Sequence, residues 1–343
     1  MKKTLPLLIL VIAVAGLAIY LTVSDDPFKS REIEQTDFVI EDTASVAKIV
    51  IADRSGRVMK LERNAEGGWL LNEKYPARSD AANLLLKTFK DVYIQRPVPK
   101  EGQEQVNTIM ATGSKKVSIY NHDDELIKIW YVGHATMDKK GTYMLLETPD
   151  RGKSAAPFVM DMKGFIGMLN TRFFTDENEW RSTTILQFPE MNLDEIDVHY
   201  PRDERSDFRI EYGGENDIRL YSPEGKRLAA FDTSKVKDYM LNYKLLSFEN
   251  FRTGLDEPQI DSVRSTLPYQ IIKVSAGNKK HEIKLWPKKA IGDQYSEDEM
   301  DGMPLDAERV YASFNDGELA LAQRFVWDRL RAPYSAFVEE NNR

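Results

Sequence analysis

Few residues of this 343-residue chain have types and spacings that could perform chemistry. The best-formed candidate is a calcium loop, because carboxylates at places 1, 3, 5 and 12 of such a loop can surround Ca²⁺ while glycine at place 6 permits the turn. The residues at places 1, 3, 5, 6 and 12 are Glu297, Glu299, Asp301, Gly302 and Glu308. Place 1 lacks the usual Asp, and the flanking residues alternate like strands. A solvated acidic loop is therefore the competing interpretation.

Other catalytic patterns are missing from the sequence. None of the four histidines has the spacing of a metal-binding motif, and the chain has no cysteine to join them. Gly152-Lys153-Ser154 resembles the end of a phosphate loop, but position 147 is Glu where that loop requires Gly. The sequence thus predicts no catalytic residue, no resident metal and no cofactor.

Aromatic residues offer a second kind of site. Most of the five tryptophans fall in alternating strands or on helix faces, where core packing is their expected role. The exception would be a pocket between two domains, and Trp180 and Tyr243 are the residues that could form its aromatic binding surface. Such a pocket would bind a glycan, a lipid or a peptide.

Charge and composition exclude several classes of protein. The chain carries 47 Lys and Arg against 55 Asp and Glu, a net charge of −8, and contains no basic tract. Binding to nucleic acid is not expected, because phosphate contacts dominate that affinity. The absence of cysteine also excludes disulfides and a lipoprotein anchor.

The N-terminal segment predicts the location. Residues 5–23 are uncharged and largely apolar, follow Lys2 and Lys3, and as a helix would span ~28 Å, close to a bilayer core. We expect an uncleaved signal anchor in the inner membrane, with the lysines in the cytoplasm and the bulk of the chain in the periplasm. A cleaved signal peptide is the alternative.

Beyond a polar linker at residues 24–37, the pattern appears twice. In each copy three alternating strands precede a helix, further strands follow, and a second helix closes the copy; Trp130 aligns with Trp286. The helices are expected at 79–94 and 161–174 in the first copy and at 235–248 and 326–337 in the second. We predict an α+β fold of two tandem repeats of antiparallel β-meanders, with helices on one face and an N-terminal transmembrane helix. The predicted domains are an anchor at 1–23, the linker, repeats at 38–180 and 181–338, and a polar tail at 339–343.

Two segments carry a family resemblance. The anchor is followed by FVIEDTASVAKIVIAD at 38–53, and PLDAERVYASFNDGELALAQRFVWDRLRAPYSAF spans 304–337. The chain resembles the bacterial domain-of-unknown-function family 4340, over roughly residues 38–337. That resemblance implies an extracytoplasmic protein without known enzyme activity, related to proteins encoded beside ABC-type export systems of the gliding-motility type. It supplies no active site to carry over.

These features favour a non-enzymatic envelope protein that is held at the membrane through residues 5–23. We expect it to act as a scaffold or accessory subunit with protein partners, because repeated sheets offer edge strands for docking. A binding module for glycan, lipid or peptide is the first alternative. A hydrolase that uses Asp and Glu is the second.

Overall fold

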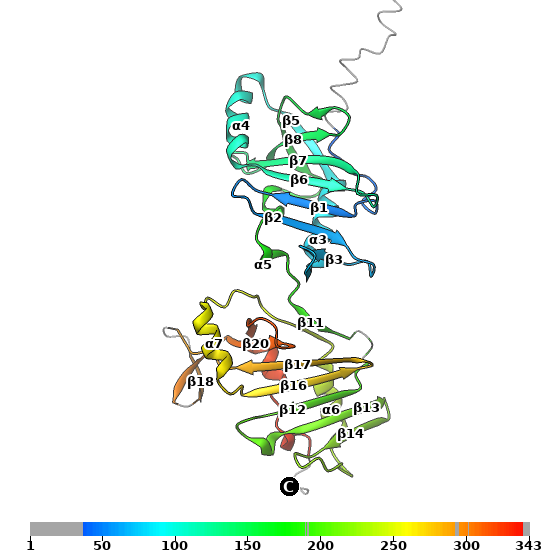
Figure 1. The fold of residues 1–343 in the computed structure, drawn as a ribbon, viewed down its shortest axis with the longest axis vertical. Helices are drawn as coiled ribbons and strands as arrows, with labels where there is room; N and C mark the ends of the chain where they lie inside the picture. Colours follow the sequence, from blue (N-terminus) through cyan, green and yellow to red (C-terminus); the bar gives the residue numbers. More distant parts are fainter. Residues whose placement is uncertain (1–36, 189, 191, 292–294, 301, 339–343) are drawn as a thin grey trace, which may run out of the picture. The chain divides into compact units, whose positions relative to one another are not determined.

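The computed structural model describes residues 37–338 except 189, 191, 292–294 and 301, and it leaves out the side chains of 295–299. The chain divides into two compact units: unit 1 ends at Ser182 and unit 2 begins at Thr183. Each unit has its own sheet and its own hydrophobic core (Figure 1). The sequence placed the boundary between residues 180 and 181.

Unit 1 is built on a ten-stranded antiparallel sheet with the order β4-β3-β2-β1-β6-β7-β8-β10-β5, in which β9 also pairs with β8. Alternation in β1, where Ile49 and Ile51 are buried, places one face of the sheet on the core. Its strands are β1 (Lys48–Ala52), β2 (Val58–Arg63), β3 (Trp69–Leu71), β4 (Tyr75–Pro76), β5 (Val92–Pro97), β6 (Lys115–Tyr120), β7 (Leu126–Ala135), β8 (Thr142–Thr148), β9 (Gly152–Lys153) and β10 (Phe158–Met162).

Unit 2 has a seven-stranded antiparallel sheet with the order β14-β13-β12-β16-β17-β20-β21. Its strands are β12 (Glu195–His199), β13 (Phe208–Gly214), β14 (Asp217–Tyr221), β16 (Gln270–Ala276), β17 (Lys279–Trp286), β20 (Arg309–Phe314) and β21 (Ala320–Gln323). Two small antiparallel pairs accompany it: β11 (Thr184–Gln187) with β15 (Leu245–Ser247), and β18 (Tyr295–Met300) with β19 (Met303–Asp306).

The two sheets share one strand order over seven strands. The segment β3-β2-β1-β6-β7-β8-β10 in unit 1 has the same connectivity as the whole sheet of unit 2, and in each the first strand of the meander pairs with the strand that follows two helices. The register pairs Val117 with Trp130 in unit 1 and Ile272 with Ile283 in unit 2. Ile283, and not Trp286, therefore occupies the place of Trp130. The predicted tryptophan alignment is off by three residues, an odd shift that moves the side chain to the other face of the sheet.

Helices cover both faces of each sheet. In unit 1, α3 (Ser79–Asp91) packs Leu85 and Phe89 into the main core, while α4 (Lys100–Gly113) packs Val106 and Met110 on the opposite face. Unit 2 repeats the arrangement with α6 (Thr233–Leu241) on its core face and α7 (Glu257–Ser265) on the other (Figure 1). The predicted single helical face is wrong, because α4 and α7 were not recognised in the sequence.

The predicted closing helices do not form as expected. Residues 161–174 continue from β10 into turns at Gly164 and Gly167, whose φ angles are 72° and 147°, and then into a 3₁₀ turn at Asn170–Arg172. Glycine at positive φ ends regular helix. The second segment gives only α8 (Arg324–Trp327) and 3₁₀ turns at Asp328–Leu330 and Tyr334–Ala336. The remaining short helices are α5 (Glu177–Trp180) and a 3₁₀ turn at Glu204–Ser206.

The predicted α+β class is consequently wrong: the structure is mostly antiparallel sheet, with 38% strand and 22% helix. The reason is that the segments assigned to closing helices form mainly turns, 3₁₀ turns and one short helix. The transmembrane helix in that prediction falls on residues 5–23, which lie outside the described residues. Among the residues that are described, no helix has the length and apolar character needed to cross a membrane.

Candidate functional site

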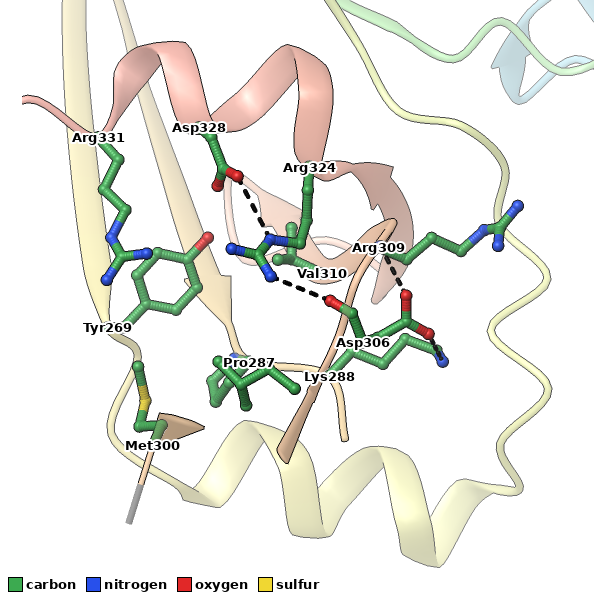
Figure 2. Close-up of a pocket in the computed structure, with 11 residues that line it drawn as sticks. Tyr269, Pro287, Lys288, Met300, Asp306, Arg309, Val310, Arg324, Asp328 and Arg331 are labelled. Carbon is green, nitrogen blue, oxygen red and sulfur yellow. Dashed lines mark hydrogen bonds and ion pairs between the residues drawn. The ribbon is translucent and has the colours of Figure 1, made fainter. Parts of the chain in front are cut away.

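A cluster of charged side chains lies in unit 2 where β19, β20 and α8 meet (Figure 2). The hollow among them measures about 10 Å³. A single water molecule requires roughly 10–15 Å³ by the same kind of measure, so the hollow admits no organic ligand. The charged side chains around the hollow therefore interact with one another and not with a bound ligand.

The centre of the cluster is a buried ion pair. Lys288 Nζ lies 2.6 Å from Asp306 Oδ2, and the other carboxylate oxygen accepts hydrogen bonds from the backbone N–H groups of Glu308 and Arg309 at 2.9 and 2.8 Å. Burial raises the pKa of Asp306, but these hydrogen bonds outweigh it and hold the pKa below its ordinary value. The carboxylate is thus ionised and saturated, and it is poorly suited to act as an acid or a base.

Two arginines in the same cluster also have internal partners. Arg309 binds Glu249 through two parallel hydrogen bonds of 2.8 and 2.9 Å. Arg324 donates to the carbonyl of Asp306 at 3.2 Å, and its Nε lies 3.3 Å from Asp328. Figure 2 shows the contact of Arg324 with Asp306, which joins the strand that carries Asp306 to the helix that carries Arg324. We conclude that the cluster braces unit 2 and is not a substrate site.

The predicted calcium loop is only partly within the described structure. Asp301 and the side chains of Glu297 and Glu299 lie outside it. The fourth candidate, Glu308, is exposed and accepts a hydrogen bond of 2.9 Å from Arg309. The β18–β19 hairpin turns at Gly302, where φ is 72°. Within the described ranges, no group of three or more His, Asp or Glu side chains is placed to hold a metal ion.

The aromatic candidates are not at a surface. Trp180 is fully buried in the core of unit 1, where its Nε1 donates to the carbonyl of Phe174 at 2.9 Å. Tyr243 is fully buried in unit 2, and its hydroxyl lies 2.7 Å from that of Tyr239. The prediction that Trp180 and Tyr243 form an aromatic binding surface is therefore wrong, since each ring is enclosed by its own core.

An exposed sheet edge is the feature that the sequence did not single out. Strand β5 ends the sheet of unit 1 and pairs only with β10. Tyr93, Gln95 and Arg96 are exposed, and no backbone group of the described residues pairs with the outer side of this strand. Beside it lies an open hollow of about 790 Å³, bordered by Val92 and Ile94 and also by charged residues: Asp37, Glu41, Lys90, Asp91 and Lys163. The signal in the sequence is the run Val92-Tyr93-Ile94, because β-branched and aromatic residues favour strands.

The other sheet ends are short or covered. Strand β4 has two residues, one of them Pro76, and its carbonyl accepts from the N–H of Ser182 at 2.8 Å. Strand β14 is bridged by Arg227, and β21 by Asn250. Natural proteins cover sheet edges in these ways because unpaired strands invite association. Among the ends of the two large sheets, β5 is thus the long edge left without such a cover.

Comparison with protein-family models, with curated proteins and with solved structures finds no match for this chain. The resemblance to the domain-of-unknown-function family 4340 accordingly remains a prediction.

Proposed function

We propose that the protein is a scaffold or accessory subunit of the bacterial envelope, held at the inner membrane by the apolar segment 5–23, and that it recruits a partner protein through β5. The observation that carries this proposal is the unpaired outer edge of β5, next to the open hollow bordered by Val92 and Ile94. An extended segment of the partner would add to the sheet by main-chain hydrogen bonds, and one of its apolar side chains would enter the hollow.

The edge also limits the partner. Pro97 has no N–H group and ends the strand, and the charged side chain of Arg96 is exposed beside it. Proline and charge at an edge discourage long pairing. A docked strand would therefore pair with about four residues, Val92–Gln95, which suits a short linear segment better than a second large sheet.

A photo-reactive residue tests the proposal in cells. One variant places it at Gln95 in β5, and a matched variant places it at Gln323, an exposed glutamine on β21, whose edge is bridged by Asn250. We expect irradiation to give a discrete adduct from position 95 and none from position 323. In the purified complex, deuterium uptake by the amides of 92–96 should fall relative to the free protein.

The same adducts from both positions, or an adduct from neither, would contradict docking at β5. Protection from exchange that avoids residues 92–96 would contradict strand addition even if a partner is captured. An adduct with twice the mass of the chain would show that β5 binds a second copy of this protein. It would contradict the proposal that a different protein docks there.

A further inference from the structure

Three cationic side chains converge on a second hollow of unit 1, about 380 Å³ in volume. They are Arg54, which follows β1, Lys116 on β6 and Lys153 on β9, and the hollow is completed by Asp53, Ser114 and Tyr131. This volume lies at the small end of the range for ligand sites, about 300–1,000 Å³. The hollow is thus large enough for a small ligand, unlike the cluster in Figure 2.

Sheet register brings the cations together. Lys116 on β6 pairs with Ala52 of β1 on one side and with Tyr131 of β7 on the other, so it lies between these two strands. Lys153 comes from the short strand β9, and its Nζ lies 3.8 Å from the centre of the Tyr131 ring. A cation at this distance is attracted by the ring, which fixes its position beside Lys116.

The cations have no ion-pair partner among the described residues. Two carboxylates are near, but both are engaged. Asp53 accepts from Ser55, Thr175 and Arg57 at 2.6–3.1 Å, and Glu147 accepts from the Tyr131 hydroxyl at 2.6 Å. Burial and the charges of Arg54 and Lys116 lower the pKa of Lys153, although Glu147 opposes them. Like charges are therefore held together with only partial compensation from Glu147.

A neutral group in the hollow is also without a partner. Ser114 is 5% exposed and lines the hollow, and its hydroxyl makes no hydrogen bond with any described residue. Because Ser114 lines the hollow, its hydroxyl is open to a ligand there and can donate a hydrogen bond to it.

Unit 2 has different residues at the corresponding positions. By the shared register, Gln270 and Ile271 occupy the places of Lys115 and Lys116, and Tyr200 occupies that of Asp53. Both sheets form with the same strand order. Lys116 is thus specific to unit 1, whereas the hollow beside Tyr200 in unit 2 carries two arginines, Arg202 and Arg331.

We propose that this hollow binds a multivalent phosphate-type anion, either free or as the headgroup of a lipid. Two compact ammonium groups and one guanidinium would neutralise it, and Ser114 would donate a hydrogen bond to one of its oxygens. Because the contacts are largely electrostatic, binding should weaken as salt is added.

Calorimetric titration of the full chain in neutral detergent with inorganic pyrophosphate tests the site. We expect saturable binding, a loss of at least tenfold in affinity in Lys116→Gln and Lys153→Gln, and a smaller loss in Ser114→Ala. Lys280→Gln provides the control, since Lys280 is an exposed lysine of β17 in unit 2. Its affinity should match the wild type, and all variants should keep the wild-type thermal transition.

Dihexanoyl phosphatidic acid as a second titrant separates the two sources of the anion. Tighter binding than pyrophosphate assigns the site to a lipid headgroup, and weaker binding assigns it to a free anion; both outcomes support the site. The proposal is overturned if neither compound binds, if Lys280→Gln loses as much affinity as Lys116→Gln, or if the double variant Lys116→Gln/Lys153→Gln binds like the wild type.

Discussion

The ammonium of Lys288 lies 2.6 Å from the carboxylate of Asp306, with the two side chains only 10% and 12% exposed. Removing one member of such a pair leaves a buried charge without compensation, which typically costs about 3–5 kcal/mol. We expect Lys288→Met to lower the free energy of unfolding of unit 2 by an amount in this range, as measured by urea denaturation. The double variant Lys288→Met/Asp306→Asn should recover part of the loss. Lys280→Met, at an exposed site, should change it by no more than ~0.5 kcal/mol.

The same pair should make unit 2 sensitive to acid. The pKa of Asp306 is lower in the folded protein than its ordinary value of about 3.9, so the folded state favours the ionised form. Its contribution to stability is fully present above pH ~4 and is lost as the pH falls through the folded pKa. Urea midpoints measured from pH 6 to pH 2 should therefore fall more steeply for the wild type than for Asp306→Asn. Parallel curves would rule out this carboxylate as a source of the acid sensitivity.

Close packing of α4 on the sheet depends on Gly133. A Cβ atom at this position would lie 3.0 Å from Met110 Cγ and 3.0 Å from the carbonyl oxygen of Tyr143, and the backbone oxygen cannot move aside easily. We expect Gly133→Ala to destabilise unit 1 by about 1–3 kcal/mol, as overpacking does. Gly102→Ala is the matched control: its Cβ would lie 3.6 Å from Val98 and it sits within α4, so it should be neutral or stabilising by up to ~1 kcal/mol.

Trp180 tests the distinction between a core residue and a binding surface. Its side chain is fully buried and packs on Phe174 with ring centres 4.1 Å apart. Trp180→Ala should cost about 3–5 kcal/mol of stability in unit 1, and Trp180→Phe should cost less because most of the ring is kept. Denaturation followed by circular dichroism measures both. A Trp180→Ala variant of unchanged stability would show that the ring is not part of the core.

Strands were the predictable part of this fold. The segments 58–63 and 126–133 alternate with period two between turn residues, and the structure forms β2 and β7 there. Helix α4 escaped prediction because its apolar face consists of little more than Val106 and Met110. For the segment 161–174 the sequence predicted a helix that does not form. Its apolar residues have helical spacing, but Gly164 and Gly167 take positive φ.

The candidate sites were less predictable because they depend on register. Lys116 lies near Arg54 because β6, which follows two helices in the chain, pairs with β1. No local pattern in the sequence predicts that pairing. The free edge of β5 is likewise a property of the whole sheet order. Trp180 and Tyr243 were proposed from their residue type and from an expected pocket between two domains. Burial, which depends on tertiary packing, places each of them in a core instead.

The ionisation of Tyr131, which lines the basic hollow, can be measured directly. Burial and the hydrogen bond to Glu147 raise the pKa of its phenol to about 12. Because the folded pKa is raised, this group's stabilising contribution is present below pH ~10, the ordinary tyrosine pKa, and is lost as the pH rises toward 12. Difference ultraviolet titration of the wild type against Tyr131→Phe should show one phenol that ionises near 12. In Glu147→Gln the pKa should fall but stay above 10, since burial remains; a value unchanged in that variant would show that the carboxylate does not act on the phenol.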